Sequence, residues 1–452
     1  MATNIRYKAI FLCSLLLFSI RGYSQGVKHV ILISIDGFRP DFYGDASWGA
    51  VNIRQLTEKG ISADGVNPVF PTLTFPNHTT IITGARPAHH GIMFNAPFLP
   101  QQEEESDEWY WYAKDIKTKT LWAAAKEKGL VTASVNWPVS AGARIDYNIP
   151  IIKGKGQTQL AVTSANSTPA GILDTVQLYA TGKFDHIDFN TNADYLVMDE
   201  NVARISGYLL RRYKPGLLTL RLSCVDHFEH IEGRSGPLVS GAVSGADRAV
   251  RTILESVERA GLKDSTVVIV TGDHGFVDYQ RTLTPNAWLL DAGLIGKDGG
   301  NDWKAKFNTA GGSAFLYLKD PGDEKTKKII MEVLAARPEL SQKLFKIYDR
   351  GVLDSMKADP AAFLAIGTVP GYRFNGSLKP IYTVTATKGT HGYFPDFKQI
   401  QTGFVAFGPG LKPGFRIPLM GLEDIASIVS QLLELDFKSE DGHMPAGILK
   451  DK

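Results

Sequence analysis

The stretch KHVILISIDGFR (28–39) begins as an apolar run and reaches a carboxylate at Asp36. Two further runs have the same form: LLTLRLSCV (217–225) is followed by Asp226, and STVVIVTG (265–272) is followed by Asp273. A short, continuous apolar run bounded by turn residues is typical of a buried β-strand. We therefore predict three strands, each with an aspartate at its carboxyl end.

Segments with helical periodicity lie between and after these runs, at 51–59, 121–129, 192–213, 238–260 and 421–435. Strands that alternate with helices indicate a mostly parallel sheet covered by helices. The stretch 279–385 breaks the alternation with glycine-rich turns, a strand at 313–318 and a helix near 322–337. We predict an α/β fold whose mostly parallel central sheet is sandwiched by helices, with 279–385 as an inserted smaller subdomain.

The N-terminus has the layout of a secretory signal peptide. Basic residues precede the apolar segment AIFLCSLLLFSI (9–20), and small residues follow near Ser24. The apolar segment is too short to span a bilayer easily, although an uncleaved N-terminal anchor is the alternative. We expect residues 1–24 to be removed and residues 25–452 to be exported, to the periplasm or the medium, without a stable membrane span.

The overall composition is that of a soluble globular protein. The chain has 452 residues, of which 44% are hydrophobic and 21% charged, and its formal net charge is +2. These values give no reason to expect nucleic acid or an anionic membrane as the main partner. After removal of residues 1–24, Cys224 is the only cysteine, so an intramolecular disulfide is not possible.

The aspartates have histidines close to them in the sequence. In open α/β sheets the ligand site lies outside the carboxyl ends of the strands, so distant aspartates can converge there. Asp226 and His230 are four residues apart, which places both on one face of a helical turn. Asp273 and His274 are adjacent, and both could reach a metal only from a tight turn.

The neighbouring glycines Gly272 and Gly275 would permit such a turn at Asp273 and His274. Carboxylate and imidazole ligands in this mixture suit zinc. An aspartate after a strand can also be only a turn or cap residue. The metal interpretation therefore depends on several such segments occurring together.

Thr74 lies in PTLTFPNH (71–78), just before a helix-like segment at 76–84. The free N–H groups and the dipole at a helix start favour a phosphate oxygen. A threonine hydroxyl becomes a nucleophile near neutral pH only when it is activated, and metal coordination can supply that activation. The alternative is that Thr74 merely caps the helix.

Six segments together resemble the nucleotide pyrophosphatase/phosphodiesterase family of the alkaline phosphatase superfamily. They are DGFR (36–39), PTLTFPNHTTIITG (71–84), HHGIMFN (89–95), DHFEH (226–230), GDHG (272–275) and GTHGY (389–393). They occur in the family's order and cover most of the chain after residue 24. The resemblance implies that residues 25–452 form an alkaline-phosphatase-like catalytic domain, a mixed α/β sandwich with two zinc ions.

The resemblance also implies roles for individual residues. One zinc ion would be held by Asp36, Asp273 and His274, and this ion would activate Thr74. The other would be held by Asp226, His230 and His391. Asn95 matches an asparagine that donates to a phosphoryl oxygen. The implied reaction is in-line attack by Thr74, followed by hydrolysis of the phospho-threonine by a zinc-bound hydroxide.

Two residues stand where the resemblance implies contact with the substrate. Phe75 matches a residue that lines the nucleotide-base pocket in relatives, and a buried aromatic at the helix start is the alternative. Arg221 stands five residues before Asp226, where many nucleotide-cleaving relatives carry a base-stacking tyrosine. An arginine can stack on a base or bind an anionic group, so the nature of the substrate stays open.

Several functions are compatible with these residues. The segment VNWPVSAG (135–142) resembles one found in the diesterase branch, which favours a small-molecule phosphodiester or nucleotide as the substrate. The aromatic segment EWYWYAKD (108–115) can line a substrate pocket or pack at the surface. An alkaline phosphomonoesterase on the same fold and a non-catalytic exported metal-binding protein are the alternatives. A sulfatase is disfavoured because Thr74 does not lie in a Cys/Ser-x-Pro-x-Arg motif.

Overall fold

The structure is a computed structural model that describes residues 26–100, 108–184, 195–296, 302–381 and 386–450. The predicted signal peptide, residues 1–24, lies outside the described residues. Within the described ranges, no helix combines the length and the apolar character that crossing a membrane requires.

The predicted mostly parallel sheet is confirmed. Its centre is β1 (His29–Ile35), which pairs in parallel with β6 (Leu217–Leu222) on one side and β7 (Thr266–Thr271) on the other. The strand order is β16-β2-β15-β7-β1-β6-β4-β5. The outer strands are β4 (Thr132–Val135), β5 (Tyr147–Ile149), β2 (Ile61–Ala63), β15 (Phe404–Phe407) and β16 (Phe415–Ile417). Of these, β15 runs antiparallel to both its neighbours.

Helices cover both faces of the sheet, which explains why the strands are apolar along their whole length. Successive side chains of β1 point to opposite faces, so Val30 and Leu32 pack in one layer while Ile31 and Ile33 pack in the other. The two helix layers hold α3 (Thr74–Thr83), α5 (Leu121–Glu127) and α15 (Asp424–Leu432) on one side, and α2 (Val51–Lys59), α8 (Tyr195–Tyr213) and α10 (Pro237–Arg259) on the other.

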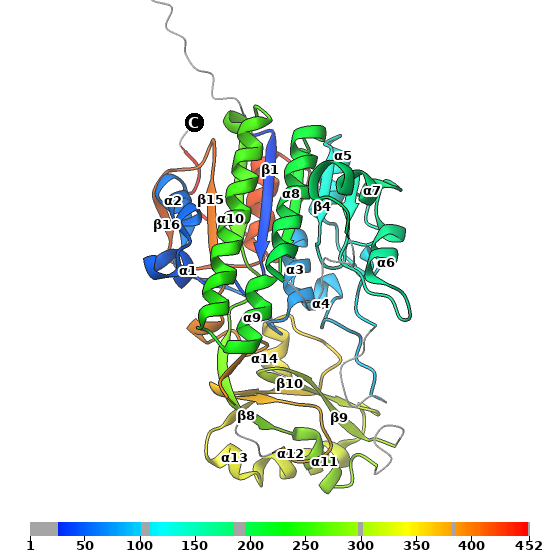
Figure 1. Cartoon of the computed structure of the whole chain (residues 1–452). Coiled ribbons are helices and arrows are strands. Elements are labelled where there is room, and N and C mark those ends of the chain that lie inside the picture. The colour runs from blue at the N-terminus through cyan, green and yellow to red at the C-terminus, as the bar shows by residue number, and fades with distance from the viewer. Residues whose placement is uncertain (1–25, 101–107, 185–194, 297–301, 382–385, 451–452) are drawn as a thin grey trace, which may run out of the picture.

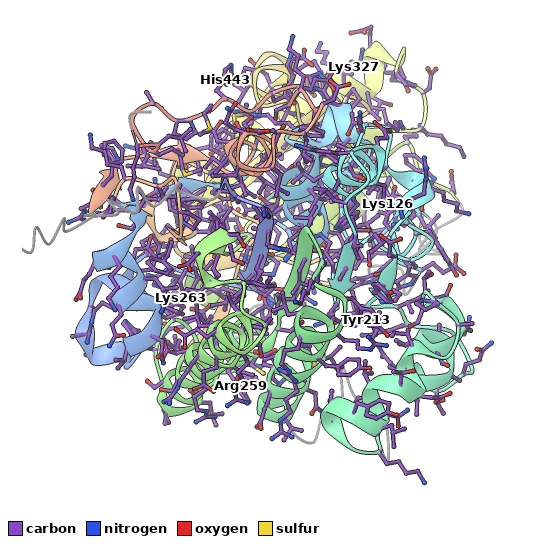
Figure 2. The ribbon with its side chains drawn as sticks, turned by 90° about the horizontal axis from the view of Figure 1, so that it is seen from above. Lys126, Tyr213, Arg259, Lys263, Lys327 and His443 are labelled. Atoms are coloured by element: carbon purple, nitrogen blue, oxygen red, sulfur yellow. The ribbon has the colours of Figure 1, made fainter. Side chains whose placement is uncertain are left out.

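The figures show these layers from two directions. In Figure 1, α8 and α10 run in front of β1. Figure 2 looks down on the layers, with Tyr213 and Arg259 marking the ends of α8 and α10. The shorter helices are α1 (Asp41–Gly44), α4 (Pro87–His90), α6 (Gln159–Asn166) and α7 (Ile172–Val176), and β3 (Val66–Asn67) pairs with β17 (Met420–Gly421).

The inserted part of the chain forms a smaller lobe beyond one end of the central sheet (Figure 1). Its four-stranded sheet contains β9 (Ala305–Ala310), β10 (Ser313–Leu318), β11 (Phe345–Tyr348) and β12 (Leu364–Thr368), all paired antiparallel. A second sheet combines β8 (Val277–Leu283), β13 (Gly371–Phe374) and β14 (Lys388–Thr390). The helices are α11 (Pro285–Asp291), α12 (Glu324–Ala335), α13 (Pro338–Ser341) and α14 (Arg350–Ser355). The lobe has its own apolar core.

One predicted strand is too long. The apolar run 217–225 was expected to be a strand throughout, but β6 ends at Leu222 and α9 (Cys224–Glu232) begins almost at once. The reason is a tertiary cap: the buried carboxylate of Asp199, on α8, accepts hydrogen bonds from the backbone N–H groups of Ser223 at 2.7 Å and Cys224 at 3.2 Å. Asp226 therefore lies in the first turn of a helix instead of at a strand end.

A second buried carboxylate caps α2 in the same manner. The helix begins after Ala50, whose side chain cannot cap it. Instead, Asp247 on α10 accepts hydrogen bonds from Ile53 N at 2.9 Å and from the side-chain amide of Asn52 at 2.6 Å. This carboxylate satisfies helix N–H groups that the sequence of α2 leaves without a local partner.

We expect Asp247→Ala to destabilise the protein by about 1–3 kcal/mol, because buried donors at the start of α2 lose a charged acceptor. Urea unfolding followed by circular dichroism would measure this as a lower midpoint. A midpoint equal to that of the unsubstituted protein would show that α2 does not depend on this cap.

Candidate active site

The first group of candidate metal ligands is Asp36, Asp273 and His274, whose ligand atoms all lie within 4.8 Å of one another. Nε2 of His274 is 3.5 Å from Oδ1 of Asp36 and 3.2 Å from Oδ2 of Asp273. All three side chains are fully buried. Asp36 directly follows β1, and the other two residues follow the neighbouring strand β7, so the parallel strands bring them together.

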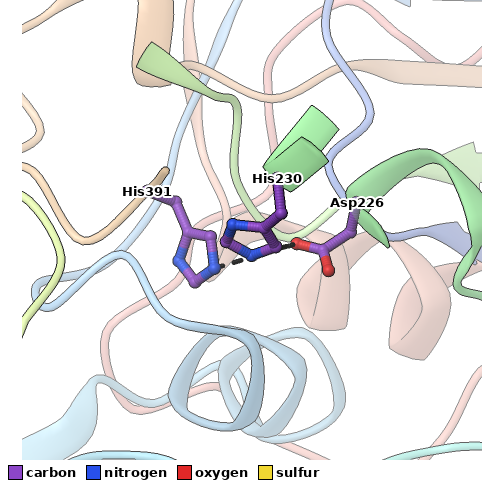
Figure 3. A group of neighbouring side chains, drawn as sticks. All are labelled: Asp226, His230 and His391. Carbon is purple, nitrogen blue, oxygen red and sulfur yellow. Dashed lines mark ion pairs between the residues drawn. The ribbon is translucent and has the colours of Figure 1, made fainter. Parts of the chain in front are cut away.

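The second group is Asp226, His230 and His391 (Figure 3). Oδ1 of Asp226 lies 3.5 Å from Nε2 of His230 and 3.7 Å from Nε2 of His391. Asp226 and His230 lie one turn apart on α9, so the predicted placement on one helical face is confirmed. His391 follows β14 and closes the group from a distant part of the chain.

The two groups are neighbours. The imidazole rings of His274, from the first group, and His391, from the second, stack with their centroids 3.8 Å apart. A substrate atom near these rings would therefore be close to both groups at once. The paired arrangement is what a two-metal site requires.

The aspartates show how well these residues fit a cation. Each has one buried oxygen without a hydrogen-bond partner, namely Oδ1 of Asp36, Oδ1 of Asp226 and Oδ2 of Asp273. These are the same oxygens that face the histidine Nε2 atoms. An unpaired buried carboxylate oxygen is strongly unfavourable, so a bound cation is the natural partner for all three.

The histidines are oriented by the backbone. In His230, Nδ1 donates to the carbonyl of Gly389 at 3.1 Å. In His391, Nδ1 donates to the carbonyl of Thr72 at 2.9 Å. In His274, Nδ1 donates to the carbonyl of Gly275 at 3.3 Å. A carbonyl can only accept, so the proton is on Nδ1 and the lone pair is on Nε2. This arrangement directs each Nε2 toward its group as a metal ligand.

The electrostatics of the site point the same way. Burial raises the pKa of Asp36, an effect that Arg221 opposes and Asp226 reinforces, and burial also raises the pKa of Asp273. Burial lowers the pKa of His274 and brings that of His391 to about 4. The imidazoles of His274 and His391 are therefore neutral near pH 7, as metal ligands must be. In His230 the effect of burial is outweighed by the neighbouring Asp226 carboxylate, which raises the pKa of the imidazole. The carboxylates of Asp36 and Asp273 need a cation to stay ionised together.

The glycines beside Asp273 are required for a reason that the sequence did not indicate. Neither Gly272 nor Gly275 has a positive φ angle, so the turn itself does not demand them. A Cβ atom on Gly272 would lie 2.6 Å from Cβ of Phe38, and one on Gly275 would lie 2.4 Å from the carbonyl oxygen of Gln399. Glycine is required at both positions because the loop that carries the ligands packs closely against neighbouring segments of the chain.

Arg221, predicted as a substrate-binding residue, has a structural partner in the site. It lies on β6 beside β1, and its Nε donates to Oδ2 of Asp36 at 2.8 Å, with Nη2 donating to the same oxygen. This pair turns Oδ1 of Asp36 toward His274. Arg221 also lines the adjacent cavity, so direct contact with the substrate stays a prediction.

Thr74 is the first residue of α3, two residues earlier than the predicted helix start. The N-cap is Leu73, and the helix start has no side-chain cap, so capping does not account for the hydroxyl of Thr74. Its Oγ1 lies 3.5 Å from Nε2 of His274. Nδ1 of His78 donates to the Thr74 carbonyl at 2.8 Å and holds the first turn in place.

Asn95 and Phe75 are linked to each other. Oδ1 of Asn95 accepts from the backbone N–H of Phe75 at 3.0 Å, which leaves the Asn95 NH₂ group as the donor end of the amide. The ring of Phe75 is 1% exposed and packs edge-on against Trp109 and Trp111, with centroids 5.0 and 5.5 Å away. Phe75 therefore lies behind Trp109, which itself lines the cavity.

A cavity of about 450 Å³ opens beside both metal-ligand groups. Thr74, Asn95 and His391 line it from the main domain, and Lys306 and Arg373 line it from the inserted lobe. Sequence reasoning did not identify these two cations, because a residue in an insertion carries no signal of which face it will occupy. Only the docking of the lobe places them opposite the candidate nucleophile.

Comparisons with known proteins identify relatives of this chain. The family model described as type I phosphodiesterase / nucleotide pyrophosphatase matches residues 30–394. The chain is 23% identical to rat ectonucleotide pyrophosphatase/phosphodiesterase family member 3, over 91% of this chain and 43% of the relative. With rat family member 7 it is 23% identical, over 93% of this chain and 86% of the relative. It thus spans less than half the length of some of the curated relatives it matches.

Solved structures show the same fold. Murine ectonucleotide pyrophosphatase/phosphodiesterase 5 superposes with a TM-score of 0.65 at 20% identity, covering 93% of this chain and 98% of the murine chain. An inactive threonine-to-alanine variant of that murine protein, in complex with AMP, superposes with a TM-score of 0.66. The fold is thus alkaline-phosphatase-like with an inserted lobe, and the chain belongs to the type I phosphodiesterase/nucleotide pyrophosphatase family.

Proposed function

We propose that this protein is an exported hydrolase of phosphodiester or pyrophosphate bonds, with Thr74 as its nucleophile and two zinc ions as cofactors. The observation that carries the proposal is the position of Thr74. Its hydroxyl lies 3.5 Å from Nε2 of His274, at the start of a helix and beside two groups of metal ligands. Mixed carboxylate and imidazole ligands favour zinc over magnesium or calcium.

The residues have complementary tasks in this reaction. Bound metal ions would supply Lewis-acid activation of the hydroxyl and would neutralise phosphoryl charge. Oγ1 of Thr74 attacks phosphorus, a new O–P bond forms, and the bond to the leaving oxygen breaks. The NH₂ group of Asn95 donates to a phosphoryl oxygen, because its Oδ1 is held by Phe75. Water then attacks the phospho-threonine and regenerates the free hydroxyl.

The relatives support a nucleotide as one substrate. Their names describe ectonucleotide pyrophosphatases/phosphodiesterases, and one structure of the murine protein contains AMP. Trp109 gives the cavity an aromatic face of the kind on which a base can stack, and it packs with Trp111 at a centroid distance of 5.6 Å. We propose a nucleotide or another small phosphodiester as the substrate class.

A phosphomonoesterase is the second candidate, and one observation favours it. A monoester carries one more negative charge than a diester, and Lys306 and Arg373 place cationic groups in the cavity. The ratio of kcat/KM for a nitrophenyl phosphodiester to that for the matching monoester separates the two functions. A ratio well below one would assign the monoesterase.

We also propose that residues 1–24 are removed during export, which leaves residues 25–452 as the mature enzyme. The proposal is supported by the sequence layout of this segment, a twelve-residue apolar core (9–20) followed by small residues. Mass spectrometry of the intact exported protein would identify the first residue.

Removal of the Thr74 hydroxyl is expected to abolish turnover. We expect Thr74→Ala to lower kcat by roughly a thousandfold or more on a nitrophenyl phosphodiester, because no other residue replaces the nucleophile. Thr74→Ser keeps a hydroxyl and should retain part of the activity. Metal content by mass spectrometry should stay near two ions per chain, because Thr74 is in neither three-residue group.

A matched control for this variant is Thr79→Ala, on the same helix. The Thr79 side chain is also buried, but its hydroxyl donates to the backbone carbonyl of Phe75 at 2.8 Å and does not line the cavity. This control should keep nearly full turnover. Full activity in Thr74→Ala would refute the assignment of the nucleophile.

The helix cap at Asp199 should control metal binding. We expect Asp199→Ala to weaken metal affinity roughly 10–100-fold, because α9, which carries Asp226 and His230, loses the side chain that positions its first turn. Competition with a chelating dye would measure the change. Asp247→Ala is the matched control, since it removes a similar cap from α2, which holds none of the ligands. Equal losses in both variants would show a general loss of stability instead.

A further inference from the structure

Arg373 is a cavity residue to which the proposed mechanism gives no task. It lies on β13, in the inserted lobe, and lines the same cavity as Thr74 and His391. Its guanidinium lies over the ring of Tyr279, with 4.8 Å from Cζ to the ring centroid. The aromatic face fixes the plane of the guanidinium without using any of its N–H donors.

Within the described residues, no hydrogen-bond acceptor is found for the donors of Arg373. Its Nε is buried and has no hydrogen-bond partner, and in the described part of the chain no carboxylate forms an ion pair with the guanidinium. A buried donor without an acceptor is unfavourable, so such a group usually has a partner that the protein alone does not supply. The chemistry of the guanidinium points to an anion as that partner.

The other two cations that line the cavity are already engaged. Arg221 donates to Asp36 through Nε at 2.8 Å. Nζ of Lys306, whose side chain is buried, donates to the Pro100 carbonyl at 2.6 Å. Among the described lining residues the only carboxylate is Asp226, which belongs to a metal-ligand group. Arg373 is therefore the lining cation that has no acceptor among the described residues, and its donors are the most available to a negatively charged part of the substrate.

The position of Arg373 is tied to the metal-ligand groups by the backbone. Phe374, the next residue, donates from its N–H to the Gly311 carbonyl at 2.7 Å, and Gly312 N–H donates to the His391 carbonyl at 2.9 Å. The hydroxyl of Tyr393 donates to the Tyr372 carbonyl. A Cβ atom on Gly311 would lie 2.2 Å from the His391 oxygen, so the lobe is in close contact with the loop that carries this ligand.

We propose that Arg373 binds a second phosphate of the substrate, the one joined by the bridging oxygen to the phosphoryl group that Thr74 attacks. The inference rests on the proposed function and gives Arg373 a role in binding the leaving group of that reaction. Arginine matches the geometry of a phosphate with two parallel hydrogen bonds. When the bridging bond breaks, its electron pair goes to the leaving phosphate, and Arg373 stabilises that added charge without transferring a proton.

The test compares two substrates that differ in the leaving group. One is a dinucleotide joined by a pyrophosphate, and the other is the nitrophenyl ester of the same nucleoside 5′-phosphate, whose leaving group has no phosphate. We expect Arg373→Gln to lower kcat/KM for the dinucleotide roughly 10–100-fold, the effect of one charge-assisted contact. For the nitrophenyl ester the change should stay within about twofold. Arg373→Lys keeps the charge but loses the paired N–H donors of the guanidinium, so its kcat/KM for the dinucleotide should lie between that of the unsubstituted protein and that of Arg373→Gln.

A matched control is Arg281→Gln. Arg281 lies on β8, beside β13, and like Arg373 it is stacked on a tyrosine, with 5.6 Å from Cζ to the centroid of Tyr372. It does not line the cavity of the candidate site. Its substitution should leave the ratio of the two kcat/KM values unchanged.

Each outcome has a distinct meaning. Equal losses on both substrates in Arg373→Gln would overturn the inference and show that Arg373 only supports the fold. No loss on either substrate would overturn it as well. If the unsubstituted holoenzyme hydrolysed neither substrate, the proposed function itself would fail. A binding measurement distinguishes this last case. Inorganic pyrophosphate should bind the Thr74→Ala holoprotein about tenfold more tightly than it binds the double variant Thr74→Ala, Arg373→Gln. Equal affinities for the two proteins would overturn the inference on their own.

Discussion

The rest of the site depends on three carboxylates, each of which has one buried oxygen without a hydrogen-bond partner among the described residues. Asp226 lies close enough to disfavour the ionisation of Asp36, and both of these carboxylates disfavour the ionisation of Asp273. Only the folding energy of a large apolar core can hold such groups in place before a cation arrives. The continuous apolar strands of the central sheet, covered on both faces, supply that core.

Hydrogen bonds around the ligands fix the orientation of these side chains. Arg221 occupies one oxygen of Asp36 and leaves the other for a metal ion. Backbone carbonyls fix the tautomer of each histidine, and Asp199 holds the first turn of α9 in place. These contacts are made between parts of the chain that are far apart in sequence.

The inserted lobe gives the site its second wall. The main domain presents Thr74 and the metal-ligand groups, and the lobe presents Lys306 and Arg373 across the cavity. The two walls are joined at Gly311 and His391, where the backbones touch. Under the proposed function, the residues that cleave the bond and the residue that binds the leaving group therefore come from different parts of the chain. Changes in the lobe could then alter the substrate without disturbing the metal-ligand groups.

The sequence by itself determined the central strands and most helices, because apolar periodicity is a local property. The division of the candidate metal ligands into two sets came from the family resemblance, and the structure brings the same residues together in two groups. The sequence could not determine that α9 begins at Cys224, that Phe75 lies behind Trp109, or that Arg221 pairs with Asp36. Each of these depends on a partner distant in the chain: Asp199, the aromatic segment near 109–111 and the strand beside β6. Arg373 was the extreme case. Its environment is made by packing between two lobes, and no pattern in the sequence near residue 373 carries that information, so only the tertiary structure decided it.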